Sequence, residues 1–538
     1  MVTRAICVDI VDDVRIEAIH NLSKKGEWSV LYWTPSGAVT NQIRKLFQDT
    51  IVHDYYDAMR GIPPEAPDFK VSQNSEELVP DADILNRMSK YEHIILAMMD
   101  RADPEHRMGY KERVTYYWRL LSYWRATINE LKPDVILFST IPHSIYDYII
   151  YCLAQINNIQ TICFVYTAFP NLFLPLASFD KRTSTEDRYN QLLTNETTGE
   201  VLLAEEIQRV VDGMVAPSPE VPLAPNLKPV RKQFLINNER YYIGISRYRF
   251  ALSGIYRLLL HKIFHGNKKK KSYMNISANQ LYDSSEISLY DFEKYKIKSR
   301  STKGVLYRDY KSRCCQVDFK RPYVYFALGY QPECQSSPLA GYFYNQLWIA
   351  KILSLSLPSG WIVYVKENPV QLSPRLYGEA SRAPDYYAQL DKIDNIRLVP
   401  TTTSTIDLID CSQCTATATG TVGLESVLRG KPVLTFGNSW YRGCEGVFSV
   451  TSVGECHKAL NEISAEYVVN EHRVRLFLLA LEETSISVFL NDSYGEPPSV
   501  SEKTMMVSQL ENLLLAFSEK GFLESIPNPQ EKRSFSYS

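Results

Sequence analysis

Two short stretches of the chain hold side chains suited to a phosphorylated ligand, and the first is VYVKENP. An apolar strand over 362–365 ends there at Lys366, which Asn368 and Pro369 follow. A lysine supplies a point charge for a phosphate, and an asparagine amide can donate hydrogen bonds to a phosphate or ribose oxygen. Pro369 fixes the turn and favours an extended conformation at Asn368. Solvent-facing polar residues at an ordinary strand exit are the simpler interpretation.

The second stretch, TGTVGLESVLRG, opens a short amphipathic helix with Thr419, Gly420, Thr421 and Val422. Unpaired N–H groups at a helix start, together with the helix dipole, attract a phosphate, and threonine hydroxyls can add hydrogen bonds. Glu425 lies one turn into the helix on the face of Thr421, where it could accept both hydroxyls of a ribose. The alternative is a plain helix start, with Thr421 as the N-cap and Glu425 complementing the dipole.

Two further loops carry candidate catalytic residues. The loop ALGYQPECQSSP leaves the first strand of the second half and carries Gln331, expected beside the nucleotide, and Glu333. A carboxylate at this place could act as a nucleophile on an anomeric carbon or as a general base, unless it only pairs with an arginine. In the first half, STIPHSIYDY puts His143 after a strand over 135–138. It could contact an acceptor hydroxyl, although a lone histidine is more often structural.

Other acidic residues and the cysteines give weaker signals. Asp9, Asp12 and Asp13 lie at the exit of the first strand and could likewise contact an acceptor. Asp81 and Asp83 form a DxD pair, but no strand precedes them, so capping of a helix is the better interpretation. The ten cysteines lack the paired spacing of a zinc site. The sequence therefore predicts no metal site and no cofactor other than a nucleotide-bearing substrate.

The elements that must position these residues repeat in both halves. Short apolar strands alternate with helices, which is typical of a parallel sheet covered on both faces. Because ligands of such sheets lie at the carboxyl ends of the strands, we expect the loops above to meet. The predicted segments are an N-terminal α/β domain on the acceptor side over 1–180, a linker and helical, basic insertion over 181–320, a C-terminal α/β domain for the nucleotide over 321–480, and helices with a disordered tail over 481–538.

The predicted strands are short and apolar, and they are expected at 4–11, 28–34, 135–138, 161–165, 323–330, 362–365, 395–400 and 432–437. Besides a helix near 146–155, we expect a long helical zone over 81–130 and a Pro-rich linker over 216–232.

Length, charge and hydropathy exclude several classes of protein. A chain of 538 residues exceeds one hydrophobic core, and 59 basic against 61 acidic side chains give no field that favours nucleic acid. Acids inside the N-terminal stretch speak against a signal peptide, and no apolar run reaches the roughly 18 residues of a spanning helix. Free cysteines in this number indicate a reducing, cytoplasmic location. The basic stretch over 254–272 is either a solvated loop or a contact with the anionic inner face of the membrane.

With these residues in place, the second half resembles the capsule polysaccharide biosynthesis family of bacterial glycosyltransferases, which includes retaining β-Kdo transferases that use CMP-Kdo. The likeness rests on YQPE after one strand, YVKENP after the next, and TGTVGLESVLRGKPVLTFG with WY shortly after. PHSIYDYIIYCLAQ in the first half also fits. The resemblance implies a GT-B-like fold, in which two Rossmann-type, doubly wound domains face a cleft.

The resemblance also implies roles for individual residues. Lys366, Asn368 and Pro369 match the family's basic–His–Pro signature for the nucleotide phosphate, with Asn368 in place of the histidine. Thr421 and Glu425 match the hydroxyl and the acid that hold the phosphate and the ribose. The departure at Asn368 puts the identity of the donor, and activity itself, in question.

Glu333 lies where the family carries an acidic residue near the reacting sugar. We therefore expect a metal-independent glycosyltransferase that moves a sugar, with CMP-Kdo or a related ulosonic acid as the first choice of donor, to a capsule or lipopolysaccharide O-antigen acceptor near His143. The alternatives are a UDP-sugar-dependent transferase, an enzyme similar to the nucleotide-sugar 2-epimerases, and an inactive glycan-binding or export partner.

Overall fold

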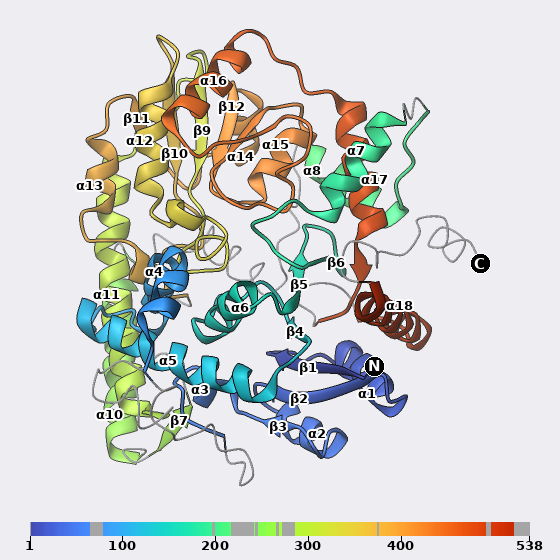
Figure 1. Ribbon diagram of the computed structural model, residues 1–538. Coiled ribbons are helices and arrows are strands. Elements are labelled where there is room, and N and C mark those ends of the chain that lie inside the picture. Colours follow the sequence, from blue (N-terminus) through green and yellow to red (C-terminus); the bar gives the residue numbers. More distant parts are fainter. Residues whose placement is uncertain are drawn as a thin grey trace.

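Two β-sheets, one from each half of the chain, stand one above the other with helices on their faces (Figure 1). The predicted linker over 216–232 lies, except for Ala216, outside the described part of the chain, as does the predicted tail. The computed structural model describes residues 2–64, 79–195, 199–216, 242, 246–264, 268–271, 286–373, 376–490 and 497–520.

The N-terminal sheet has seven strands in the order β15-β6-β5-β4-β1-β2-β3. Strands β1 to β5 are parallel in the order 3-2-1-4-5, which is that of a Rossmann-type sheet, whereas β6 and β15 are antiparallel to their neighbours. The strands are β1 (Thr3–Val8), β2 (Trp28–Thr34), β3 (Ile51–Val52), β4 (Val135–Phe138), β5 (Gln160–Tyr166), β6 (Leu172–Leu176) and β15 (Ile486–Ser487).

Helices cover both faces of this sheet because successive side chains of its strands point in opposite directions. Ile6 and Val8 of β1 lie in one buried cluster, whereas Ala5 and Cys7 lie in another on the opposite face. The helices of this half are α1 (Asp13–Lys24), α2 (Val39–Leu46), α3 (Tyr55–Ala58), α4 (Ala82–Ala102), α5 (Tyr110–Leu131) and α6 (Tyr146–Ile156).

The predicted helical zone over 81–130 is two helices, α4 and α5. The loop between them is held by the buried carboxylate of Asp103, which accepts the backbone N–H groups of Arg107 and Met108, both at 2.8 Å. At the start of α4, the carboxylate of Asp81 accepts the N–H of Ile84 at 2.9 Å. Helix capping by Asp81 is therefore confirmed.

The C-terminal sheet has six parallel strands in the order β11-β10-β9-β12-β13-β14. Numbered along the chain, this order is 3-2-1-4-5-6, again that of a Rossmann-type sheet. Val324 and Phe326 of β9 face one buried cluster, and Tyr323 and Tyr325 face another. The strands are β9 (Tyr323–Ala327), β10 (Ile362–Lys366), β11 (Ile396–Val399), β12 (Cys414–Thr417), β13 (Val433–Thr435) and β14 (Val447–Ser449).

The helices of the C-terminal half cover both faces of its sheet, and the two domains together confirm the predicted GT-B-like, doubly wound α/β class. They are the short 3-10 helices η2 (Gly341–Tyr344) and η3 (Gly378–Ser381), with α12 (Gln346–Ser356), α13 (Tyr386–Asp391), α14 (Thr405–Asp410), α15 (Val422–Leu428) and α16 (Val453–Ser464).

The end of the chain returns to the N-terminal half. Helix α17 (Glu471–Thr484) packs against α7 (Ser184–Thr194), β15 joins the N-terminal sheet, and α18 (Val500–Lys520) packs against α1. An ion pair of 2.6 Å between Lys25 and Glu511 lies at the last of these contacts. The described residues after β15 therefore complete the N-terminal domain.

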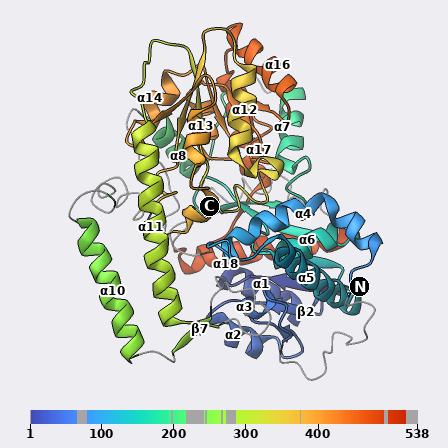
Figure 2. The same cartoon turned by 90° about the vertical axis from the view of Figure 1, so that its left-hand side faces the viewer.

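Helical elements also come from the middle of the chain. Helix α8 (Glu205–Val215) lies against α15, and α10 (Ser246–Phe264) lies against the long helix α11 (Leu289–Arg313) (Figure 2). The short strands β7 (Lys269–Lys271) and β8 (Glu286–Ser288) pair with each other. Among the described residues, no helix combines the length and the apolar character needed to cross a bilayer.

Candidate active site

The strand order of each sheet reverses at one point, and the candidate catalytic residues follow the strands at these two points. In the N-terminal sheet the reversal lies between β1 and β4, whose exits carry Asp9 and His143. In the C-terminal sheet it lies between β9 and β12, whose exits carry Glu333 and the segment from Thr419. Such reversals leave a crevice at the carboxyl ends of the strands, where ligands of open α/β sheets bind.

Glu333 connects the two domains. One carboxylate oxygen lies 3.6 Å from Nη2 of Arg101, at the end of α4, and the other lies 3.8 Å from Nε2 of His143. The side chain of Glu333 is 41% exposed, so both partners leave it open to a ligand. Arg101 also donates from Nη1 to the backbone carbonyl of His143 at 3.0 Å, which joins the three groups into one cluster.

The charge of Glu333 follows from these neighbours. Burial acts to raise the pKa of its carboxyl, but the charges of Arg101 and His143 and the backbone N–H of Cys334 outweigh it, so the pKa is lowered. Glu333 is therefore a carboxylate at neutral pH. An ionised carboxylate is suited to act as a nucleophile or to stabilise positive charge, rather than to donate a proton.

His143 is held by its backbone and by one ring nitrogen. Nδ1 lies 2.6 Å from the carbonyl oxygen of Ile141, so the proton on this nitrogen is donated there and Nε2 is directed toward Glu333. The backbone N–H groups of His143, Ser144 and Tyr148 all donate to the buried carboxylate of Asp147. Asp147 thus fixes the loop that presents the imidazole to the cleft.

Asp9 is the second acid of this region. It takes a left-handed conformation, with φ at 54°, directly after β1. Burial first, and then the neighbouring charge of Asp147, raise the pKa of Asp9 to about 7, although Ser36 and Arg15 act in the opposite direction. A carboxyl that titrates near neutral pH can take up and release a proton during turnover, which is what a general acid or base requires.

The raised pKa of Asp9 predicts a pH-dependent stability. Below about pH 4 the folded and the unfolded chain both hold this proton, and up to about pH 7 only the folded chain holds it. The free energy of unfolding should therefore fall as the pH rises through this window, by at most about 1.4 kcal/mol per unit from this group. Asp9→Asn should remove that contribution, as measured by the melting temperature across the window.

A neighbouring carboxylate provides the control for this measurement. Asp13 is exposed at the start of α1, so the melting temperature of Asp13→Asn should fall with rising pH as steeply as that of the wild-type protein. If the melting temperature of Asp9→Asn also falls with pH as steeply as that of the wild type, a group other than Asp9 takes up the proton.

On the donor side, the polar residues of VYVKENP make hydrogen bonds within their own domain. Lys366 is buried, and its amine donates to the carbonyl of Thr403 at 2.6 Å and to the hydroxyl of Thr405 at 2.7 Å. Asn368 accepts the N–H of Val370 at 3.0 Å, which forms a turn that includes the partly buried Pro369. These contacts fix the strand exit, with Asn368 at its partly exposed edge.

Gln331 lies in a buried polar network below the cleft. Its amide accepts from Gln346 at 2.8 Å and from Arg382, and donates to the carbonyl of Tyr344. Arg382 in turn binds the carboxylate of Glu367 through two hydrogen bonds of 2.8 and 3.0 Å. The side chain of Gln331 thus supports the loop that carries Glu333.

The start of α15 is held by a hydrogen bond within its own segment and by two that join it to other loops. Thr419 donates its hydroxyl to the carbonyl of Gln335 at 2.7 Å, and the N–H of Gly420 donates to the hydroxyl of Thr417 at 3.1 Å. The hydroxyl of Tyr441 donates to the carbonyl of Gly420. A Cβ at Gly423 would lie 2.3 Å from this hydroxyl oxygen, so only glycine fits there.

The remaining candidates of this segment lie on α15 itself. Thr421 is the N-cap residue, but its side chain makes no capping hydrogen bond, and both Thr421 and Val422 are partly exposed. Glu425 is buried one turn further along. The structure therefore brings Glu333 together with His143. Gln331 lies in the same loop as Glu333, and the other donor-side candidates lie at two further strand exits of the same sheet.

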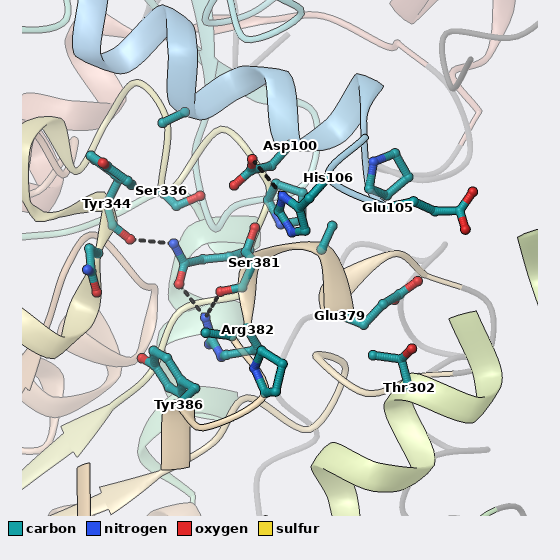
Figure 3. A pocket seen from close by; sticks show the side chains of 18 of the residues that line it. Asp100, Glu105, His106, Thr302, Ser336, Tyr344, Glu379, Ser381, Arg382 and Tyr386 are labelled. Atoms are coloured by element: carbon teal, nitrogen blue, oxygen red, sulfur yellow. Dashed lines mark hydrogen bonds and ion pairs between the residues drawn. The ribbon is translucent and has the colours of Figure 1, made fainter. Parts of the chain in front are cut away.

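A cavity of about 550 Å³ adjoins the loop of Glu333 (Figure 3). It lies between the end of α4, helix α11 and the segment around η3, and hydroxyl, amide and aromatic side chains predominate among its polar groups. Gln331 is the one predicted site residue among its lining groups. Neighbouring lining residues include Pro332, Ser336, Tyr344, Asn345, Ser381 and Tyr386.

Sequence reasoning missed Arg101, Asp147 and this cavity. Arg101 lies near the end of a helix, and nothing in its local sequence marks it as a partner of Glu333. Asp147 is four residues after His143, and its position at the first turn of a helix could have indicated that it caps the loop.

Comparison with known proteins gives one family match. Residues 355–460 match the family model described as "Capsule polysaccharide biosynthesis protein". This segment contains β10 to β14 with Lys366, Asn368, Thr421 and Glu425, but neither Glu333 nor His143. No curated protein matches the chain.

Solved structures are similar to the chain at low identity. The UDP-GlcNAc 2-epimerase of Methanocaldococcus jannaschii is 12% identical, with 95% of this chain and 100% of that chain covered and a TM-score of 0.22. The spinosyn rhamnosyltransferase SpnG is 10% identical (95% and 100% covered, TM-score 0.23). A glycosyltransferase from Rickettsia africae is also 10% identical (96% and 99% covered, TM-score 0.23). Likenesses at this level say nothing about the substrate of this chain.

Proposed function

We propose that the protein is a glycosyltransferase that moves a sugar from a nucleotide-activated donor to a glycan acceptor of a bacterial surface polysaccharide. The observation that carries this proposal is the meeting of Glu333 with Arg101 and His143. An ionised carboxylate from one domain faces a cation and an imidazole from the other, where the strand order of both sheets reverses. The match of residues 355–460 to a capsule biosynthesis family supports the same class.

The cluster suits a displacement in two steps. In the first, a carboxylate oxygen of Glu333 forms a bond to the anomeric carbon while the bond from that carbon to the nucleotide phosphate breaks. In the second, an acceptor hydroxyl attacks the same carbon, gives up its proton to a base, and releases the carboxylate. His143 and Asp9 are the candidate bases, and Arg101 holds Glu333 in place.

The donor is assigned to the C-terminal domain. Its phosphate would lie near Lys366, Asn368 and Pro369 and the segment Thr419 to Val422. The carboxylate of Glu425 would accept hydrogen bonds from the hydroxyls of its ribose. CMP-Kdo or a related ulosonic acid is the first choice, since its departure as CMP needs no metal ion. A UDP-sugar would occupy the same domain with different contacts to its base.

Nucleotide binding tests this proposal before any sugar is known. CMP, UDP, GDP and CDP are added separately to the wild-type protein and to Glu425→Ala, and the melting temperatures are compared. A nucleotide at about 100 times its dissociation constant adds roughly 2.7 kcal/mol to the free energy of unfolding. We expect CMP to stabilise the wild type selectively and to lose most of this effect in the variant.

The other outcomes separate the alternatives. Stabilisation by UDP alone would change the donor and keep the class. A nucleotide sugar that is converted without any acceptor would point to an epimerase. No response to any of the four nucleotides would overturn the proposal.

A further inference from the structure

Helix α10 presents an apolar stripe to solvent. Leu252, Ile255, Tyr256, Leu259 and Ile263 are each between 47% and 70% exposed. At 3.6 residues per turn, these five positions fall within an arc of about 100° on one side of the helix. Large apolar side chains gathered in this way mark an interaction surface rather than a solvated helix.

The opposite side of α10 is used within the molecule. Gly254 lies roughly opposite the stripe and is buried against Ile297 of α11, where an added Cβ would come within 3.1 Å of that side chain. Figure 2 shows α10 outside α11, on the side away from the N-terminal domain. The stripe therefore faces outward, away from the core of the molecule.

The sequence around the stripe is strongly basic. From 246 to 282 the chain contains no Asp or Glu and eight Lys or Arg residues. Among the residues whose side chains are described, Lys262 at the edge of the stripe and Lys268 and Lys269 beyond α10 are exposed, whereas the exposed Arg257 lies on the other side of the helix. An apolar stripe flanked by cations is the pattern of a helix that lies in the interface of an anionic bilayer.

We propose that the outer face of α10, with Lys268 and Lys269, binds the surface of an anionic lipid bilayer. Charge decides between a bilayer and a second copy of the chain. Helix α10 itself contains no acid, so two copies that met through this face would bring their cations together, whereas anionic headgroups complement them. Because no described helix can span a bilayer, α10 lies on the surface with its stripe among the acyl chains.

The position of α10 relates the bilayer to the cavity beside Glu333. Gly254 is level with Ile297 and Arg300 of α11, and Tyr295, Ser299 and Thr302 of the same helix line the cavity. The two helices, each about 10–12 Å across, therefore separate the bilayer from the cavity. A glycan acceptor could therefore reach the cavity while its lipid stays in the membrane. This access of an acceptor rests on the proposed function, whereas the binding of α10 to the bilayer does not.

Flotation with lipid vesicles tests the binding. The full-length protein is mixed with vesicles of equimolar phosphatidylglycerol and phosphatidylcholine, or of phosphatidylcholine alone. We expect binding to the anionic vesicles only. Leu252→Ser combined with Ile263→Ser should weaken binding at least about tenfold. Lys268→Ala combined with Lys269→Ala should weaken it by roughly fivefold per charge and reduce its dependence on salt.

A matched control comes from α12. Trp348 and Leu355 are exposed there to a similar degree, so Trp348→Ser combined with Leu355→Ser should leave vesicle binding unchanged. Equal binding to the neutral vesicles, or equal losses in the control, would overturn the proposal. So would a dimer in solution that the α10 variant dissociates, in the absence of vesicle binding. Retained stabilisation by a nucleotide would show that the proposed function survives such a failure.

Discussion

Glu333→Gln is expected to lower the rate of sugar transfer by about 100-fold or more while leaving the fold intact. The amide keeps the shape of the side chain but removes the negative charge that faces the anomeric carbon, and it cannot form the covalent intermediate. Arg101 and His143 lie 3.6 and 3.8 Å away, so the variant loses one long ion pair and one long contact with an imidazole rather than a buried ion pair. Product formation with the donor identified by thermal shift measures the effect.

The control is a carboxylate outside the cleft that also forms a long ion pair with an arginine. Glu445 lies 3.7 Å from Arg473 in the same domain, and Glu445→Gln should leave transfer within about twofold of the wild type, because surface ion pairs contribute little. Unchanged melting temperatures would show that both variants fold. Transfer by Glu333→Gln at the wild-type rate would exclude Glu333 from the reaction and leave His143 and Asp9 as the candidates.

Much of the fold was predictable because the strands are short, apolar and bounded by turns. The spans expected at 28–34 and 135–138 coincide with β2 and β4, and the expected helix near 146–155 is α6. Continuous apolar runs indicate strands that are buried on both faces, and such strands belong to parallel sheets. The positions of the candidate loops followed, since strand exits of one parallel sheet share an edge.

The partners of buried polar groups were not predictable. Glu367 belongs to the same KENP motif as Lys366, yet it is fully buried against Arg382, a residue in a loop without periodicity. Gln331 is drawn into the same network. Such pairings depend on how distant loops fold back over the sheet, and neither hydrophobic periodicity nor turn residues record this.

The sequence also did not predict that the chain returns to the N-terminal domain after α17. Strand β15 has two residues, Ile486 and Ser487, too few for any alternation to be visible. Helix α18 carries an apolar face that could pack against either domain. That α18 packs against α1 follows from contacts in the structure, such as those of Glu511 with Asn21 and Lys25.

Arg382→Met is expected to lower the free energy of unfolding of the C-terminal domain by about 3–5 kcal/mol, because it leaves a carboxylate buried without its counter-charge. Arg382 and Glu367 are 0% and 1% exposed and share two hydrogen bonds, so the variant removes the counter-charge of a carboxylate that is itself buried. Urea unfolding and amide exchange in β10 measure the loss. Arg473 is 54% exposed in its ion pair with Glu445, so Arg473→Met should lower the free energy of unfolding by no more than about 1 kcal/mol. Equal costs in the two variants would show that the buried pair contributes no more to the stability of the domain than the exposed pair does.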